Sequence, residues 1–503
     1  MEPDISSTLN HKPVLPKTVH PYLVLTICCS SLLLIGMDAT IVNVALPTIQ
    51  FDMRASLSGL QWVVDAYTIV LASLLLFSGS MSDRFGRRRV FQIGLTIFAL
   101  GSLLCSVAHS IAGLAMFRAL QGLGASMLNP VALSIVANVF PDPKKRAQAI
   151  GVWGAVMGIS LATGPVLGGA LIQTVGWRAI FWINLPICAA AILLTARFVP
   201  ESRAPRARAF DSVGQLLAFT ALFSLTYAII EGPHRGWHSF PIIGLFAAAF
   251  LCFALFLLYE LLCRDPLIDP RFFHSAPFSG AIILAIVTFS SYSGFLFLNT
   301  LYLQQARGFS AFHTGLCTLP FAAAIIITAP LSGRMVGHYG PRPSMAVAGL
   351  GFLLSTLILT RLSLDTPLPL LMLAYSLFGT GLGMINAAIT NNAVSGMPLA
   401  QAGVAAAVAS TGRQVGTALG VAIAGAVFAV NRARGLDFIH ATYTVWWSMA
   451  ASAVVILLIG WIVTTERAKH SATDVAVRFQ SAERVLPLEN VHVLPNVVSS
   501  RKA

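Results

Sequence analysis

Fourteen apolar stretches, each long enough to cross a lipid bilayer, dominate this chain of 503 residues. A helix needs roughly 20 mainly apolar residues to span the hydrocarbon core. Backbone groups in hydrocarbon must be hydrogen-bonded within one helix or a closed barrel, and these stretches are too long and continuous for barrel strands. We therefore expect an all-α integral membrane protein. The expected spans are approximately residues 23–46, 59–79, 90–108, 111–139, 147–172, 180–198, 213–230, 241–262, 278–303, 314–331, 344–362, 368–388, 404–430 and 442–463.

The composition excludes several classes of protein. Apolar residues make up 56% of the chain, charged residues 10%, and the mean hydropathy is +0.79. Soluble domains are about 45–50% apolar and about 25% charged, so a soluble enzyme and a disordered chain are excluded. The net charge of +13 comes from short basic clusters between the apolar stretches. This is the pattern of cytoplasmic membrane loops, and we expect no nucleic-acid partner.

The distribution of Lys and Arg predicts the orientation. With the N-terminus in the cytoplasm, the cytoplasmic loops and tails carry 23 of the 32 Lys and Arg residues, and the outer loops carry seven. The remaining two, Arg118 and Arg413, lie inside expected spans. This bias favours an even number of spans with both termini cytoplasmic. No cleavage site of small residues stands at signal-peptide distance, so we expect the first span to be retained.

Three local patterns recur in the same order about 250 residues apart, which indicates an internal repeat. Each match is weak alone, but together they pair spans two, four and five with spans ten, twelve and thirteen. Two six-helix halves with two additional helices between them fit this shift of eight spans, and repeated halves are typical of secondary transporters. The matched segments are 79–88 with 333–342, 122–124 with 381–383, and 163–168 with 411–416.

Four motifs stand in order in the first half of the chain. They are residues 37–47 in the first span, Gly79–Arg89 after the second, Arg118 with Gln121 and Gly122 in the fourth, and Gly158 through Gly164-Pro165 to Gly168-Gly169 in the fifth. With these motifs, the chain from about residue 23 to residue 463 resembles the major facilitator superfamily, and within it the fourteen-span drug:proton antiporter family. The second half departs from the pattern, because Gly337 stands where the first half has Asp83.

The resemblance implies a fold of two six-helix bundles with two extra central helices. We expect a cytoplasmic tail at 1–22, an N-terminal bundle at 23–198, a linker with two extra helices at 199–277, a C-terminal bundle at 278–463, and an unstructured cytoplasmic tail at 464–503. It also implies a multi-pass protein of a bacterial cytoplasmic membrane. The expected function is export of hydrophobic, cationic or neutral, drugs or related small molecules in exchange for protons, without enzymatic activity.

Few ionisable side chains lie deep inside the spans, among them Asp38, Asp65 and Arg118. An Asp or Arg at a helix centre costs about 2.5–3.5 kcal/mol, so each needs a partner, a wet cavity or a function. An apolar surrounding favours the protonated form of a carboxyl, so Asp38 is our first candidate for proton coupling. Asp65 is a second candidate, and Arg118 belongs to a motif that the resemblance places near the proton pathway. The alternatives are a structural hydrogen bond for Asp38, hydration near the outer mouth for Asp65, and an interhelical clamp for Arg118.

The loop after the second span is the candidate gate, with Gly79, Asp83, Arg84, Gly86 and Arg87. Asp83 could cap a helix or pair with a basic residue of the opposite bundle and so lock one state. An ordinary cytoplasmic charge cluster is the alternative, and for each arginine singly the more economical one.

The fifth span carries a dense cluster of small residues, including Gly158, Gly164, Pro165 and Gly168. Glycines spaced by four lie on one helix face, where another helix can approach closely, and a proline bends the helix. We expect a hinge and a seal against proton leakage here. General enrichment of glycine in membrane helices is the alternative.

The expected substrate pocket is aromatic and apolar. Aromatic faces bind flat or cationic molecules, but they also pack helices and anchor them at the lipid interface. Arg413 stands at the position of Pro165 in the other half, and either binds an anionic substrate group or pairs with a carboxylate. The candidates for substrate binding are Trp62, Tyr67, Tyr292, Asn299 and Arg413.

The sequence contains no motif that favours a cofactor or a different function. No glycine-rich stretch runs into Lys followed by Ser or Thr, so no ATP-binding loop is present, and we expect neither a cofactor nor a metal. The expected partners are a small hydrophobic substrate, protons and the lipid bilayer; nothing points to an accessory envelope protein. A substrate:proton symporter or a metabolite exporter would use the same fold. A membrane sensor or channel would not need paired repeats.

Overall fold

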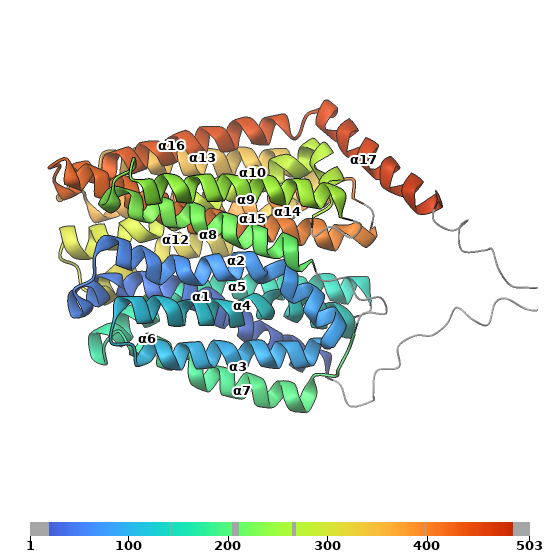
Figure 1. Ribbon diagram of the computed structural model, residues 1–503, viewed down its shortest axis with the longest axis horizontal. Helices are drawn as coiled ribbons and strands as arrows, with labels where there is room; N and C mark the ends of the chain where they lie inside the picture. Colours follow the sequence, from blue (N-terminus) through green and yellow to red (C-terminus); the bar gives the residue numbers. More distant parts are fainter. Residues whose placement is uncertain (1–19, 141, 204–210, 264–267, 398, 486–503) are drawn as a thin grey trace, which may run out of the picture.

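The computed structural model describes residues 20–140, 142–203, 211–263, 268–397 and 399–485. Long helices lie side by side in one bundle, with both described ends of the chain at the same end (Figure 1). We call this the terminal end. The helices are α1 (Pro21–Met53), α2 (Leu57–Phe85), α3 (Arg87–Ser106), α4 (Ile111–Val139), α5 (Pro143–Thr174), α6 (Ala179–Trp182), α7 (Asn184–Phe198), α8 (Ser212–Arg235), α9 (Phe240–Leu262), η2 (Pro270–His274), α10 (Ala276–Leu301), η3 (Tyr302–Ala306), α11 (Ala311–Cys317), α12 (Leu319–Tyr339), α13 (Pro341–Leu359), α14 (Leu368–Val394), α15 (Leu399–Ala433), α16 (Phe438–Ile462) and α17 (Glu466–Val485).

The helices confirm a multi-pass membrane protein. Within the described residues, 13 helical segments are long and apolar enough to cross a bilayer. The sixth expected span is formed by α6 and α7 together, and the tenth by α11 and α12. The fifth expected span corresponds to α5, which has 32 residues and lies inside the bundle but is not one of these 13. The number of fourteen spans therefore stays a prediction.

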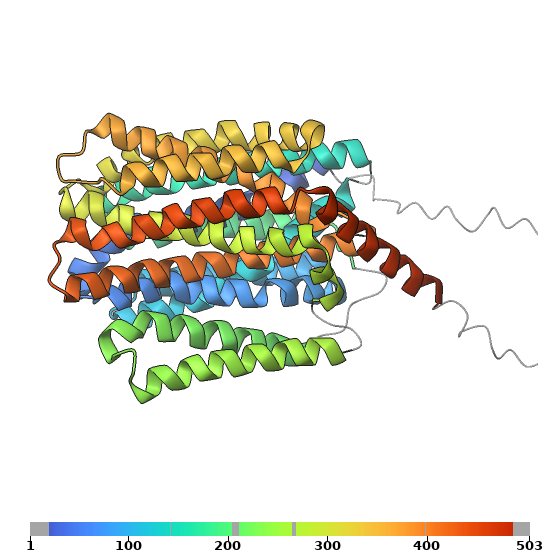
Figure 2. The ribbon, with the colours of Figure 1, turned by 90° about the horizontal axis from the view of Figure 1, so that it is seen from above.

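Two groups of helices form the bundle, α1–α7 and α10–α16, which we call the first and second halves. In Figure 1 the blue-to-teal first half lies below the yellow-to-red second half. The inserted helices α8 and α9 pack on each other at one edge of the bundle (Figure 2). Since α8 contacts α2 of the first half and α15 of the second, the inserted pair covers the seam between the halves.

Local sequence signals explain where the site-bearing helices begin. The Ser56 hydroxyl accepts the Gly59 N–H at the start of α2, and the Ser110 hydroxyl accepts the Gly113 N–H at the start of α4, both at 3.1 Å. A serine that caps a helix in this way satisfies one of the backbone donors left free in its first turn. The two caps fix the start of the helices that carry Asp65 and Arg118.

Glycines of the repeat make equivalent contacts in the two halves. Gly86 and Gly340, with φ of 108° and 78°, adopt a backbone conformation that favours glycine, and each precedes the third helix of its half. On α5, a Cβ at Gly168 would lie 2.4 Å from Ile41 of α1; on α15, a Cβ at Gly416 would lie 2.4 Å from the Ile286 carbonyl of α10. The matched glycines thus pack on matched helices.

One match within the repeat was out of register. A Cβ at Gly124 of α4 would contact Phe98 of α3, and a Cβ at Gly381 of α14 would contact Phe352 of α13. Gly124 therefore corresponds to Gly381, whereas the sequence comparison paired Gly122 with Gly381. A Gly-x-Gly pattern also occurs at 379–381, and spacing alone could not distinguish it from 381–383.

The two halves are joined by side-chain hydrogen bonds near the end opposite the termini. Long amide side chains of one half reach backbone or side-chain oxygens of the other. The bonds run from Gln61 Nε2 to the Val421 and Ala422 carbonyls (3.2 and 3.0 Å), from Gln304 Nε2 to the Val44 carbonyl (2.9 Å), and from Gln305 Nε2 to Gln50 Oε1 (2.6 Å).

The expectation of an unstructured tail after residue 463 is wrong for residues 466–485. These residues form α17, which starts against η2 and α10 and extends beyond the bundle (Figure 1). Ala468, Ala472 and Val475 recur at helical spacing and are buried, while the ion pair of Glu466 with Lys469 is exposed. The helix is too polar to span a membrane. An amphipathic helix is recognised by the spacing of its apolar residues, and the length of an apolar stretch does not reveal it. Of the expected tails, residues 1–19 and 486–503 lie outside the described residues.

Candidate transport site

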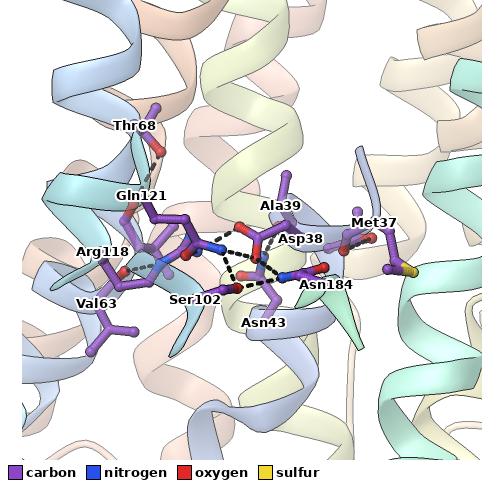
Figure 3. Close-up of polar contacts among 12 residues, drawn as sticks. Met37, Asp38, Ala39, Asn43, Val63, Thr68, Ser102, Arg118, Gln121 and Asn184 are labelled. Carbon is purple, nitrogen blue, oxygen red and sulfur yellow. Dashed lines mark hydrogen bonds and ion pairs between the residues drawn. The ribbon is translucent and has the colours of Figure 1, made fainter. Parts of the chain in front are cut away.

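A buried ion pair stands at the centre of the first half. Asp38 of α1 and Arg118 of α4 are 0% and 1% exposed, and Arg118 Nη1 donates to Asp38 Oδ2 at 2.5 Å. The other carboxylate oxygen, Oδ1, accepts from Gln121 Nε2 at 2.9 Å and from Asn184 Nδ2 at 3.3 Å. Figure 3 shows these side chains converging on the Asp38 carboxylate. The geometry brings together Asp38 and Arg118, two candidates for proton coupling, and it also fits the interhelical clamp that was the alternative for Arg118. Proton coupling by these residues stays a prediction.

A second layer of contacts fixes the orientation of these groups. Ser102 Oγ of α3 accepts from both Gln121 Nε2 (3.0 Å) and Asn184 Nδ2 (2.8 Å). Arg118 Nε donates to the Val63 carbonyl of α2 at 3.1 Å, and its guanidinium lies 4.2 Å from the centre of the Tyr67 ring. Among the described residues, the hydrogen-bond partners of Asp38 are all donors, and this arrangement fits an ionised carboxylate. Tyr67 thus contacts this network, and substrate binding by Tyr67 stays a prediction.

Asp65 lies outside the network. It is fully buried on α2, and neither carboxyl oxygen has a hydrogen-bond partner among the described residues. One helical turn earlier, Gln61 donates to the Val421 and Ala422 carbonyls of α15. A buried carboxylate without donors is costly, so this environment favours the neutral form of Asp65. The two candidate carboxyls thus occupy opposite environments.

Trp62 faces the inserted helix α8. Its ring centre lies 5.3 Å from that of Tyr227 and 5.8 Å from that of Phe223, and Nε1 donates to Glu231 Oε1 at 3.3 Å. All three partners belong to α8. These contacts give Trp62 a packing role between α2 and α8, and substrate binding by Trp62 stays a prediction.

Tyr292 and Asn299 of α10 lie in an aromatic cluster of the second half. Tyr292 stacks on Phe321 of α12 with ring centres 5.9 Å apart, and it is 7% exposed. Asn299 Oδ1 accepts a hydrogen bond from the Tyr375 hydroxyl of α14. The cluster fills the interior between three helices, so both residues are packed in this conformation.

Arg413 of α15 has neutral partners. Its Nη1 donates to Asn386 Oδ1 at 3.3 Å and to Thr390 Oγ1 at 3.4 Å, both on α14. These distances are at the long end of the range for hydrogen bonds. Of the two sequence alternatives, pairing with a carboxylate finds no contact among the described residues.

The small residues of α5 form close helix contacts. A Cβ at Gly164 would lie 1.9 Å from Thr40 Oγ1 and 3.0 Å from the Met37 carbonyl of α1, on either side of Asp38 in sequence. On the side facing the second half, a Cβ at Gly158 would lie 3.1 Å from Ile326, and the Pro165 carbonyl lies 2.3 Å from the Cβ position of Gly315. The helix thus contacts both α1, which carries Asp38, and the second half.

In the loop expected to act as a gate, the contacts of Asp83 and Arg87 lie within the first half. Asp83 pairs with Arg87 one turn later at 3.1 Å, and the Arg87 Nη1 donates to the Ser134 carbonyl of α4 at 3.5 Å. Gly86 separates α2 from α3, and a Cβ there would lie 2.6 Å from Glu201 Oε1. A Cβ at Gly79 would meet no atom within 4 Å, and Arg84 is exposed.

Comparison with known proteins shows the family of this chain. Residues 28–421 match the model of the Major Facilitator Superfamily. The chain belongs to the major facilitator superfamily. It is 40% identical over 399 residues to the multidrug resistance protein Stp of Mycobacterium tuberculosis (79% of this chain, 74% of that protein). It is 36% identical over 427 residues to the tetracenomycin C resistance and export protein of Streptomyces glaucescens (85% and 79%). It is 34% identical over 406 residues to the methylenomycin A resistance protein of Bacillus subtilis (80% and 87%).

A solved structure supports the major facilitator fold. The crystal structure of the human organic anion transporter MFSD10 (TETRAN) superposes with a TM-score of 0.60, covering 89% of this chain and 100% of that chain, at 17% identity. At this identity the likeness concerns the fold alone.

Three polar residues of this major facilitator protein were missed by the sequence analysis. Ser102 and Asn184 hold the Asp38 network, and Glu201 Oε1 accepts the Arg88 N–H at the start of α3 (3.1 Å). Single Ser and Asn residues are common in membrane helices, where they often bond to their own backbone, so they gave no signal. Glu201 stands in a charged loop, and its position after the sixth span could have suggested a contact with the neighbouring loop after the second.

Neutralising Asp83 tests the gate of this major facilitator protein. We expect Asp83→Asn to lower the transport rate several-fold and to change the apparent substrate affinity less, because the ion pair lies far from the buried Asp38 network. Stability should change by less than about 1 kcal/mol, since both side chains are partly exposed. Initial efflux rates over a range of substrate concentrations measure both quantities. Glu466→Gln, which removes an exposed ion pair on α17, is the matched control; an equal loss in both variants would contradict a gating role.

Proposed function

We propose that this protein is a proton-driven antiporter that exports hydrophobic drugs or related small molecules, neutral or cationic, across the cytoplasmic membrane. The observation that carries the proposal is the buried Asp38–Arg118 pair inside a major facilitator fold. The similarity to proteins named for multidrug resistance and antibiotic export supports the substrate class.

The geometry around Asp38 suggests how a proton is coupled to transport. Three donor groups, from Arg118, Gln121 and Asn184, face an ionised carboxylate. A proton that binds to Asp38 cancels its attraction for Arg118, so the cation must find other partners and α4 must shift against α1. Protonation and the present arrangement therefore exclude each other. The proton is bound in a different conformation from the one described.

The contacts between the halves support an assignment of the transport state that this conformation represents. The hydrogen bonds joining the halves lie near the end opposite the termini. With both termini in the cytoplasm, this is an inward-facing state with its outer side closed. An ionised Asp38 in that state is ready to receive substrate, and protonation from outside follows once the halves have rocked.

Asp65 is the second candidate in the coupling. It lies at the contact of α2 with α15, where the halves meet, and its environment favours the neutral carboxyl. Opening of this contact would expose Asp65 to water and allow it to lose its proton. The opening and closing of the outer side would thus control proton exchange at Asp65. Proton exchange at Asp38 is controlled by its pairing with Arg118.

Transport in membrane vesicles tests this function. Inside-out vesicles that contain the protein should accumulate a fluorescent hydrophobic dye when their interior is acidified, and an ionophore that collapses the pH gradient should abolish accumulation. Vesicles without the protein are the control. Accumulation driven equally well after the gradient is collapsed would refute proton coupling. Dye movement in the same direction as protons would instead identify a symporter, and movement without saturation a channel.

A further inference from the structure

Arg413 is a cation inside the second half, and none of the described residues is an acidic partner for it. Its two hydrogen bonds, to Asn386 and Thr390, are long and go to neutral oxygens. A charged side chain in a membrane span ordinarily pairs with an opposite charge or lines a wet cavity. Arg118 illustrates the first case, since it meets Asp38 at 2.5 Å. Arg413 makes no such pair among the described residues, which leaves the second case for Arg413.

Arg413 links two helices of the second half, α14 and α15. Helix α14 packs mainly on α12 and α13, and α15 packs mainly on α10, so α14 and α15 contact each other little. The Arg413 side chain bridges them. Arg413, Asn386 and Thr390 are all partly exposed, although each lies on a helix of the bundle.

The charge balance of the interior favours an anion at this point. Asp38 is neutralised by Arg118, and the surroundings of Asp65 favour its uncharged form. The positive charge of Arg413 is thus not offset by these two interior acids. A guanidinium presents a planar set of donors that matches the two oxygens of a carboxylate, and such charged bonds are shorter and stronger than those to Asn386 and Thr390.

We propose that Arg413 binds a carboxylate or similar acidic group of a substrate, so that this exporter accepts hydrophobic organic acids besides neutral and cationic compounds. The inference rests on the proposed function and specifies a substrate class for it. The Asn386 amide and the Thr390 hydroxyl hold the guanidinium in place until the acid binds.

A matched pair of probes tests this assignment. Anthracene carboxylate and anthracene carboxamide share one fluorescent ring system and differ in the charge of a group of the same shape. We expect wild-type vesicles to transport both. Arg413→Gln should reduce carboxylate transport at least tenfold more than carboxamide transport (roughly 1.4 kcal/mol for each factor of ten). Arg413→Lys, which keeps the charge but not the planar fork, should give an intermediate ratio.

The control variant is Arg432→Gln, which neutralises an exposed arginine at the far end of the same helix. It should leave both rates as in the wild type. If Arg413→Gln and Arg413→Lys lower both rates in equal proportion while Arg432→Gln does not, Arg413 only clamps α14 to α15 and the inference is wrong. If the wild type transports the carboxamide in response to a pH gradient but not the carboxylate, the inference again fails while the proposed function stands. Transport of neither probe nor any hydrophobic dye would refute the proposed function itself.

Discussion

Asp38→Asn is expected to reduce proton-driven efflux to the background of vesicles that lack the protein. The asparagine has nearly the same shape as the aspartate, but it cannot exchange a proton. In the folded protein the Asp38 carboxylate accepts hydrogen bonds from Arg118, Gln121 and Asn184. None of these three partners carries a carboxyl group that could take over the proton exchange. Uptake of dye by inside-out vesicles under an imposed pH gradient measures the loss.

A loss of folding must be separated from a loss of coupling in this variant. Removing one partner of a buried ion pair leaves the other charge uncompensated, at a cost of about 3–5 kcal/mol. The double variant Asp38→Asn with Arg118→Gln removes both charges, and we expect it to regain thermal stability but no transport. As a control, Asp52→Asn removes an exposed carboxylate near the C-terminal end of α1, and this variant should transport as the wild type does. Wild-type efflux by Asp38→Asn would exclude this residue from proton coupling.

Gly164→Ala is expected to have the second largest effect. The added Cβ would lie 1.9 Å from Thr40 Oγ1 and 3.0 Å from the Met37 carbonyl. The Thr40 hydroxyl is itself bonded to the Gly36 and Met37 carbonyls at 3.1 Å, so rotating it away breaks these bonds. Overpacking of this kind costs about 1–3 kcal/mol. We expect a lower melting temperature and transport below about one tenth of the wild-type rate, because α5 would be pushed from the helix that carries Asp38.

Two further variants show whether the close contact is the cause. Gly244→Ala on α9 adds the same methyl group where no atom lies within 4 Å, and it should transport as the wild type does. Thr40→Ala combined with Gly164→Ala removes the nearest colliding atom and should restore part of the transport. Full activity of Gly164→Ala alone, measured in the same vesicles, would show that α1 and α5 need not approach this closely.

Much of the fold could be predicted from the sequence because membrane spans obey a simple physical rule. Length and apolar content placed the helices, and the recurring glycines showed two related halves. The same reasoning failed for α17, because an amphipathic helix is recognised by its spacing and not by apolar length. It also mispaired Gly122 with Gly381, since adjacent Gly-x-Gly patterns look alike until helix contacts are known.

The site could be predicted only in part, for a related reason. Asp38, Asp65 and Arg118 were conspicuous because charges in apolar helices are costly. Which carboxyl pairs with Arg118 depends on the rotation and depth of three helices, and the sequence contains no direct measure of either. Trp62 was expected in the pocket but contacts α8, because the position of an inserted helix pair is set by packing between distant segments.

Substrate-induced proton release from the purified protein tests the central claim most directly. At a pH where part of the wild-type protein carries a proton on Asp38, a transported drug should draw that part into the ionised, drug-binding state, and a pH indicator in weakly buffered detergent solution should record the released protons, with little or no release from Asp38→Asn. Equal release from both proteins, or binding of the drug to the wild type without any release, would contradict an exchange of proton for substrate at Asp38.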